Sequence, residues 1–160
     1  MRDLQSPGRS PARSTGAMAA TSHPLSTLAA LDIMRAGGNA MDAAICASAV
    51  QAVVEPQSTG IGGDCFALYC PRGSDEVIAF NGSGRAPRAA TVDAYRAMGL
   101  EEVPKRGVHA VTVPGAIDGW CQLLTDHGRL DMDTVLAPAI HYAENGYVVH
   151  DRVAVDWRDV

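Results

Sequence analysis

The glycine-rich run GIGGD at 60–64 is one place where residue types and spacing could do chemistry. Successive backbone amides in such a run can cradle an anion such as phosphate. However, the run follows an expected helix instead of a strand, no Lys-Ser/Thr pair follows it, and Asp64 would repel phosphate. We therefore expect the glycines to serve a structural purpose, which is to let strand and helix backbones approach closely.

Histidine and cysteine side chains could hold a metal ion only if their spacing brought them together. The five histidines and four cysteines lack the short paired spacing of a zinc site, which favours isolated polar or packing roles and reduced thiols. Cys65 and Cys70 lie in an expected strand on opposite faces, so they cannot easily bridge. No pair of carboxylates stands out by spacing, and we expect neither a metal ion nor another cofactor.

Threonine hydroxyls are candidate nucleophiles when a base stands beside them. Thr59 beside Gly60 is superficially attractive, but a turn threonine ahead of a strand is far more often a local hydrogen-bonding group. We assign none of the chain's threonines as a nucleophile: Thr15, Thr21, Thr27, Thr59, Thr91, Thr112, Thr125 and Thr134.

The elements that must position these groups are clearest between residues 35 and 63, which read RAGGNAMDAAICASAVQAVVEPQSTGIGG. Gly37 and Gly38 can close a helix in the left-handed conformation, and Asn39 can cap the next one, with Asp42 completing an imperfect capping box. Residues 40–54 are almost all apolar and many are small, which predicts a helix buried on nearly all sides. At about fifteen residues this helix is too short to span a bilayer.

The rest of the chain predicts an α+β fold. Proline at position 56 ends the buried helix, and turn residues at 71–75 join two short strands into a hairpin. The expected strands are 17–21, 65–70 and 76–80, and the other expected helices begin at Pro24, at Thr91 as the cap of 91–98, at Pro114-Gly115 and at Asp131.

Composition limits the classes of partner. The net charge is −5, only 5% of residues are aromatic, and no lysine-arginine stripe is present, which argues against nucleic acid. Residues 1–15 are rich in Ser, Pro, Gly and Arg and lack an apolar run, so we expect a disordered leader. The sequence as written indicates a cytoplasmic protein without a membrane partner, or a periplasmic or secreted one if the true N-terminus carries a leader.

Several motifs in order resemble the opening of the γ-glutamyltranspeptidases, also called glutathione hydrolases. They are GAMAAT at 16–21, His23-Pro24, GGNAMDAA at 37–44, GIGG at 60–63, TVPG at 112–115 and LAPA at 136–139. The resemblance runs from about Gly16 to at least Val149. It implies that 16–160 is the N-terminal segment of a large subunit, an incomplete domain and part of the αββα sandwich of N-terminal-nucleophile hydrolases.

In the resembled family the precursor cuts itself before an internal threonine, whose free amine then activates its own hydroxyl. No threonine of this chain lies in the T-T-H-like context of that cleavage point. The resemblance therefore implies that the nucleophile lies outside this chain, which we expect to be inactive alone. The implied partners are the remaining large-subunit residues, the small catalytic subunit, and a γ-glutamyl or related acyl-amide substrate.

The resemblance also points to Arg85 as a substrate-binding residue. The family binds the substrate α-carboxylate with an arginine in a motif resembling D-G-R-E-x-A-P. This chain reads NGSGRAP at 81–87, so Ser83 stands at the family's arginine position and Arg85 is displaced by two. In a strand that shift would keep the same face and move the group by roughly 6 to 7 Å.

Three interpretations of Arg85 stay open. It reaches the carboxylate through a changed loop, the pocket is rebuilt for another acyl group, or Arg85 is a surface residue in a glycine-rich turn. The second is slightly favoured over the first, because NGSGRAP resembles a branch that includes cephalosporin or glutaryl acylase-like proteins. The sequence thus favours part of an amide hydrolase or acyl transferase, and the alternative is a noncatalytic structural module of the same family.

Overall fold

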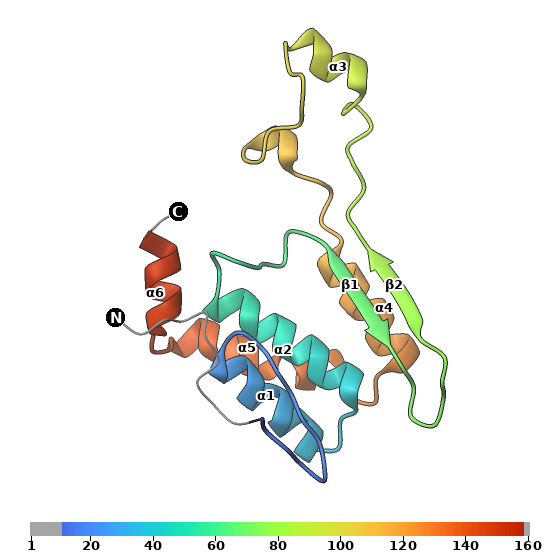
Figure 1. Cartoon of the computed structure of the whole chain (residues 1–160), viewed down its shortest axis with the longest axis vertical. Coiled ribbons are helices and arrows are strands. Elements are labelled where there is room, and N and C mark those ends of the chain that lie inside the picture. Colours follow the sequence, from blue (N-terminus) through green and yellow to red (C-terminus); the bar gives the residue numbers. More distant parts are fainter. Residues whose placement is uncertain (1–10, 159–160) are drawn as a thin grey trace. The chain divides into compact units, whose positions relative to one another are not determined.

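The computed structural model describes residues 11–158 and shows an α+β chain that divides into two units (Figure 1). One unit comprises residues up to 60 together with those from 126 onward, and the other comprises 61–125. The first ten residues of the expected leader lie outside the described residues, and 11–15 are exposed without regular secondary structure. Within 11–158, no helix combines the length and apolar character needed to cross a membrane.

The first unit is built from helices around one buried helix. Helix α2, Ala40–Val54, packs against both α1, Pro24–Arg35, and α5, Met132–Asn145. Small side chains allow close packing, and in one place the hydroxyl of Ser26 on α1 donates to the carbonyl of Ala47 on α2 at 2.7 Å. The prediction of a helix over 40–54 is confirmed, and nine of its fifteen positions are buried. Burial on nearly all sides is not observed within 11–158, because Ala40, Ala44 and Ser48 form an exposed stripe.

The corner between α1 and α2 forms as the sequence predicts. Gly37 has φ +102°, and the amides of Gly37 and Gly38 donate to the carbonyls of Met34 and Ile33 in the pattern of a Schellman motif. Asn39 then accepts from the amide of Asp42 at 3.1 Å, and Asp42 Oδ2 accepts from the amide of Asn39 at 2.7 Å. Both halves of the capping box are therefore present.

Asp42 also does something that the local pattern does not predict. Its side chain is fully buried, and it accepts hydrogen bonds from the backbone amides of Arg129, at 3.0 Å to Oδ1, and Leu130, at 3.3 Å. Asn39 adds a bond from Nδ2 to the carbonyl of His127 at 2.6 Å. We call Asn39 and Asp42 the clasp, because the two cap residues hold the segment that leads into α5.

The expected strand at 17–21 is wrong. This segment has no strand assignment, and within 11–158 no backbone ladder partner is recorded for it. A strand exists only as half of a hydrogen-bonded pair. A short run of mainly apolar residues, AMAAT, was therefore not sufficient to specify a strand.

The C-terminal helix α6, Asp151–Arg158, was not predicted. Half of its residues are charged, and only Val153 is buried. Arg152 Nε pairs with Asp156 Oδ2 at 2.8 Å one turn later. One buried side chain in eight residues leaves too weak a periodic signal to read.

The second unit contains an antiparallel hairpin of β1, Cys65–Tyr69, and β2, Ile78–Gly82. The hairpin prediction is confirmed, although β2 begins and ends two residues later than expected. The register pairs Cys65 with Gly82 and Tyr69 with Ile78. The half-buried face of the hairpin lies against helix α4, Ala116–His127, where the Cβ of Cys65 comes 3.0 Å from the position of a Cβ built on Gly119.

The other face of the hairpin is uncovered within the described chain. Phe66 and Leu68 point outward with 67% and 80% of their surfaces exposed. Beyond β2 the chain makes an excursion through α3, Val92–Ala97, and a short 3₁₀ helix, Val108–Ala110, before it enters α4 (Figure 1). Thr91 caps α3 as predicted, accepting from the amide of Ala94 at 3.2 Å.

Candidate functional site

Arg85, the predicted substrate-binding residue, lies on an exposed loop just after β2. Because β2 ends at Gly82, the argument that a two-residue shift keeps the same strand face does not apply. Among the residues that the structure describes, no ion pair or hydrogen bond is recorded for the guanidinium group. A free, exposed arginine is able to make a two-pronged contact with a carboxylate.

The backbone around Arg85 is fixed although its side chain is exposed. The carbonyl of Arg85 accepts from the amide of Val113 at 2.9 Å, and the amide of Gly84 donates to Asp64 Oδ1 at 2.7 Å. A Cβ on Gly84 would lie only 1.8 Å from the carbonyl oxygen of Val113. The loop and the segment that leads to α4 are thus in direct backbone contact, which explains glycine at position 84.

Ser83, at the position of the family's arginine, makes hydrogen bonds within its own loop. Its hydroxyl donates to Asn81 Oδ1 at 2.7 Å, and its amide donates to the same oxygen at 3.0 Å. This is an Asx-type arrangement that turns the chain as it leaves β2. Ser83 is therefore used to shape the loop, and the only cation in NGSGRAP is Arg85.

The glycine run at 60–63 does not do what we expected of it. Among residues 11–158, a Cβ on Gly60, Gly62 or Gly63 would meet nothing within 4 Å, so no close backbone approach is observed at these glycines in the described chain. Close approach occurs instead at glycines further along the chain, such as Gly115, where a Cβ would lie 2.5 Å from the carbonyl oxygen of Gly82. What the run does provide is the carbonyl of Gly63, which accepts from the amides of Gly115 and Ala116, both at 2.9 Å.

The threonine that stood beside this run is part of a turn. The amide of Thr59 donates to the carbonyl of Glu55 at 3.2 Å, where the chain leaves α2. Two cysteines are poor nucleophiles for a physical reason: burial raises the pKa of Cys65, and burial together with the charge of Asp32 raises the pKa of Cys46 to about 12. Within 11–158, the side chains of His, Cys, Asp and Glu form no cluster able to hold a metal ion.

Sequence reasoning missed a buried polar group in the first unit. His23 is only 2% exposed, and its Nδ1 accepts from the amide of Leu25 at 3.2 Å, which caps α1. Burial lowers the pKa of His23; the nearby charge of Glu55 opposes this shift and that of His150 adds to it. Glu55 is buried too and accepts hydrogen bonds from Ser22 and from Gln51. Two sequence signals could have pointed to this group. His23 directly precedes the proline that starts α1, and Glu55 ends α2.

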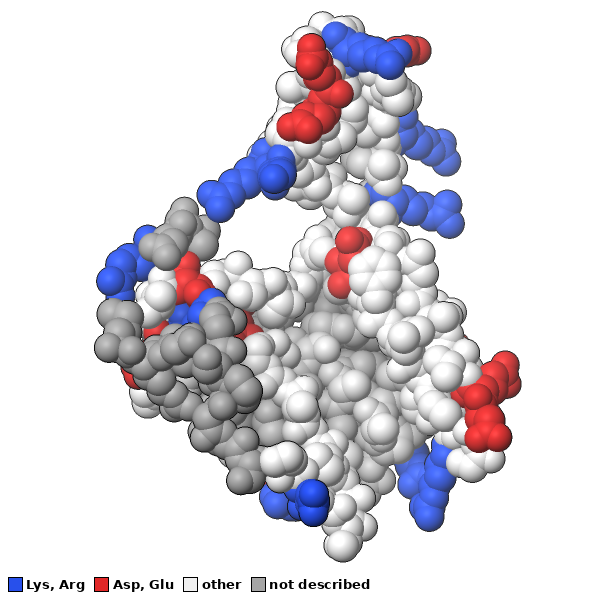
Figure 2. Space-filling view, in the orientation of Figure 1, with Lys and Arg blue, Asp and Glu red and all other residues white. Residues whose placement is uncertain are grey.

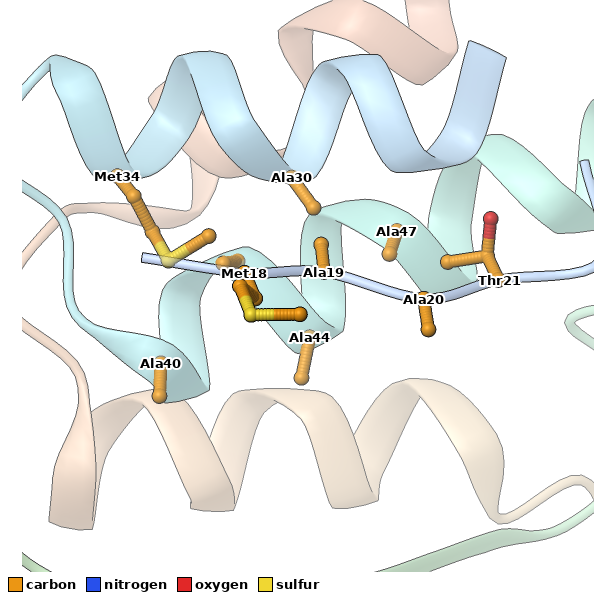
Figure 3. Close-up of a pocket in the computed structure, with 10 residues that line it drawn as sticks. Met18, Ala19, Ala20, Thr21, Ala30, Met34, Ala40, Ala44 and Ala47 are labelled. Atoms are coloured by element: carbon orange, nitrogen blue, oxygen red, sulfur yellow. The ribbon is translucent and has the colours of Figure 1, made fainter. Parts of the chain in front are cut away.

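A cavity of about 190 Å³ in the first unit carries no chemistry of its own. Figure 3 shows that the segment with Met18, Ala19 and Ala20 runs past α1, which contributes Met34, and past α2, which contributes Ala44. The lining contains no ionisable side chain. The cavity therefore marks loose packing of small residues around 18–21 and does not explain catalysis.

Charged side chains in the second unit are of both signs. Figure 2 shows Lys and Arg beside Asp and Glu around α3, and wide uncharged surface elsewhere on this face. This mixed pattern does not resemble the continuous basic stripe with which proteins follow a nucleic-acid backbone. The role of Arg85 in the NGSGRAP loop as a substrate-binding residue stays a prediction.

Comparison with known proteins shows the family to which the chain belongs. The sequence profile of the family described as Gamma-glutamyltranspeptidase matches residues 26–160. A glutathione hydrolase-like proenzyme of Bacillus subtilis strain 168, YwrD, is 43% identical over 136 residues, which cover 84% of this chain and 26% of the relative. The chain thus spans about a quarter of the length of that curated relative.

Solved structures show the same relationship. The cephalosporin acylase of Bacillus halodurans is 46% identical with a TM-score of 0.83, over 99% of this chain and 30% of that one. The γ-glutamyltranspeptidase of Helicobacter pylori is 31% identical with a TM-score of 0.86, over 93% of this chain and 44% of that one. With a family match over most of its length and neighbours of this fold, the chain belongs to the γ-glutamyltranspeptidase family of N-terminal-nucleophile hydrolases.

Proposed function

We propose that the complete protein hydrolyses or transfers the γ-glutamyl group of glutathione and related amides. The attacking group is an N-terminal threonine located outside these 160 residues, freed when the precursor cuts itself. Its own amine accepts the hydroxyl proton and passes it to the leaving amine as the amide C–N bond breaks and the acyl-enzyme forms. Water or another amine then takes the acyl group and regenerates the free threonine. The observation that carries the proposal is the family match over 26–160, together with a free arginine on the loop where the family motif falls.

In this proposal Arg85 binds the carboxylate of the acyl donor. Its backbone is held by Val113 and by its neighbour Gly84, while its side chain is exposed and has no recorded partner within 11–158. Binding a carboxylate would therefore not require breaking an existing ion pair. A planar guanidinium can form two parallel hydrogen bonds with a carboxylate, which lysine cannot.

We also propose that 16–160 is one part of an αββα sandwich in a large subunit, completed by the remaining chain and a small subunit. The outward face of the hairpin supports this. Phe66 and Leu68 lie side by side in alternate positions and are 67% and 80% exposed. An apolar sheet face of this kind is stable in water only when another layer covers it.

A second candidate function is an acylase that acts on a carboxylated acyl group other than γ-glutamyl, such as glutaryl. Serine at position 83 in place of the family's arginine favours it, as does the 46% identity with a cephalosporin acylase. Both candidates use the same covalent chemistry and both need a cation for the acyl carboxylate. They differ in whether the donor must carry an α-amino group.

The test is a comparison of Arg85→Ala with Arg85→Lys in the complete protein, on γ-glutamyl and glutaryl p-nitroanilide. Loss of a two-pronged carboxylate contact should lower kcat/KM by about 10- to 100-fold on the true donor, mostly through KM, and lysine should restore only part of it. Arg88→Ala, which removes another exposed arginine three residues on, is the matched control and should change KM less than twofold, about the scatter of surface substitutions. An unchanged KM in Arg85→Ala on both donors would rule out the proposed contact.

A further inference from the structure

Asp64 stands just before β1, and its side chain reaches across to the segment that leaves β2. Its Oδ1 accepts a hydrogen bond from the backbone amide of Gly84 at 2.7 Å. The backbone pairing of the hairpin stops at Cys65 and Gly82, so this bond joins the two chain segments beyond the last pair. A bond from an amide to a carboxylate is charge-assisted and roughly twice as strong as a neutral one.

The loop is held from its other side as well. The amide of Val113 donates to the carbonyl of Arg85 at 2.9 Å. A Cβ at Gly84 would collide with the carbonyl oxygen of Val113, and it would also lie 2.7 Å from the hydroxyl oxygen of Thr112. The backbone on both sides of the Arg85 side chain is thus held. Asp64 binds the amide of Gly84, and Val113 binds the carbonyl of Arg85.

Asp64 is itself anchored, although its side chain is exposed. The carbonyl of the preceding Gly63 accepts from the amides of Gly115 and Ala116, at the start of α4. The carboxylate therefore projects from a backbone that α4 holds in place. A carboxylate that merely interacted with water would not need a partner twenty residues away in the sequence.

We propose that Asp64 is a positioning residue for Arg85. This inference rests on the proposed function, in which Arg85 binds the acyl carboxylate, and Asp64 does not itself touch the substrate. By fixing the Gly84 amide it limits the directions that the Arg85 side chain can take. Without it, substrate binding must also order the loop, and that cost lowers affinity for the carboxylate.

The test uses Asp64→Ala, Asp64→Asn and Asp64→Glu in the complete, self-cleaved protein. Removing a hydrogen bond worth about 1 kcal/mol should raise KM for γ-glutamyl p-nitroanilide about fivefold, with kcat changed less than twofold. Asparagine keeps an oxygen acceptor and should restore most of the affinity. Glutamate keeps the charge but moves the carboxylate by one methylene, so it should also raise KM.

Two readouts separate positioning from a general structural role. First, 4-aminobutyryl p-nitroanilide lacks the carboxylate, and its KM should not change in Asp64→Ala. Second, Asp64→Ala should have little further effect in an Arg85→Ala background, because the two substitutions disrupt one interaction. If Asp64→Ala does not self-cleave, Asp64→Glu takes its place as the variant that disrupts the bond, and Asp64→Asn remains its control.

The outcomes distinguish this inference from the proposal beneath it. If Arg85→Ala leaves KM unchanged, the proposed contact is wrong and the role of Asp64 falls with it. If Arg85→Ala raises KM but the Asp64 variants do not, only the positioning role is overturned. The positioning role is also overturned if Asp64→Ala raises KM equally for γ-glutamyl and 4-aminobutyryl p-nitroanilide, or raises KM as much in the Arg85→Ala background as in the parent protein. Either result would assign Asp64 to general loop stability.

Discussion

Replacing Asp42 by alanine should release the segment that leads into α5. The carboxylate is fully buried and accepts from the backbone amides of Asn39, Arg129 and Leu130. Each buried donor left without an acceptor costs about 1 to 3 kcal/mol, and we take the lower figure because Arg129 is exposed enough for water to enter. The three lost bonds then sum to about 3 kcal/mol, a large share of the 5 to 15 kcal/mol that holds an ordinary domain together.

The assay is amide hydrogen exchange in the complete protein, followed by mass spectrometry of peptides that span 127–131. A loss of about 3 kcal/mol from the local free energy of opening corresponds to exchange about 100-fold faster. Asp42→Asn keeps one oxygen acceptor but turns its amide NH2 group toward a backbone donor, so its exchange should fall between those of the parent protein and Asp42→Ala. The effect should be confined to 127–131 and the start of α2.

Asp32→Ala is the matched control, because it removes an aspartate of the neighbouring helix whose only recorded side-chain ion pair within 11–158 is with the exposed Arg35. A surface ion pair of this kind is worth about 0 to 1 kcal/mol, so exchange at 127–131 should hardly change. If Asp42→Ala accelerates exchange no more than Asp32→Ala does, the clasp does not hold this segment and the reasoning is refuted.

Three further predictions concern other parts of the chain. Gly84→Ala should sharply reduce the yield of cleaved protein, because its Cβ would lie 1.8 Å from the carbonyl oxygen of Val113, whereas Gly62→Ala meets nothing within 4 Å and should be tolerated; equal yields would contradict this. Burial lowers the pKa of His23, so the unfolded chain binds the proton more tightly and stability should fall as pH drops below about 6.5 toward the lowered value. His23→Asn, which can still cap α1, should weaken this pH dependence of the urea midpoint. An unchanged pH dependence would mean that groups other than His23 cause it. Leu68→Ser should reduce self-association of the 160-residue chain expressed alone, measured by sedimentation, and a parent chain that is monomeric and unfolds cooperatively would count against an uncovered hairpin face.

Local sequence patterns were sufficient wherever one segment determines its own structure. Gly37 and Asn39 set the corner between α1 and α2 through backbone conformation and side-chain capping within a few residues. The same holds for Thr91 at α3 and for Asp131, whose Oδ1 accepts from the amide of Thr134 at 2.7 Å. Such signals depend on neighbours in the sequence, so they can be read without knowing the fold.

Patterns failed where the partner lies far away in the sequence. Residues 17–21 are a short, mainly apolar run without a recorded ladder within 11–158. The glycines at 60–63 suggested a close backbone approach, which occurs at Gly84 and Gly115 instead. The bond from Asp64 to Gly84 spans twenty residues, and no spacing rule predicts it. For the same reason the sequence could name Arg85 but could not show what holds its loop.

The measurement that tests the account most directly is the intact mass of the protein produced from its complete natural reading frame, with γ-glutamyl p-nitroanilide and glutaryl p-nitroanilide hydrolysis assayed on the same sample. The account predicts two fragments separated just before a threonine, hydrolysis of one of these donors, and loss of that activity when the threonine is replaced. A single uncut chain that hydrolyses neither donor would contradict it and would favour a noncatalytic structural member of the family.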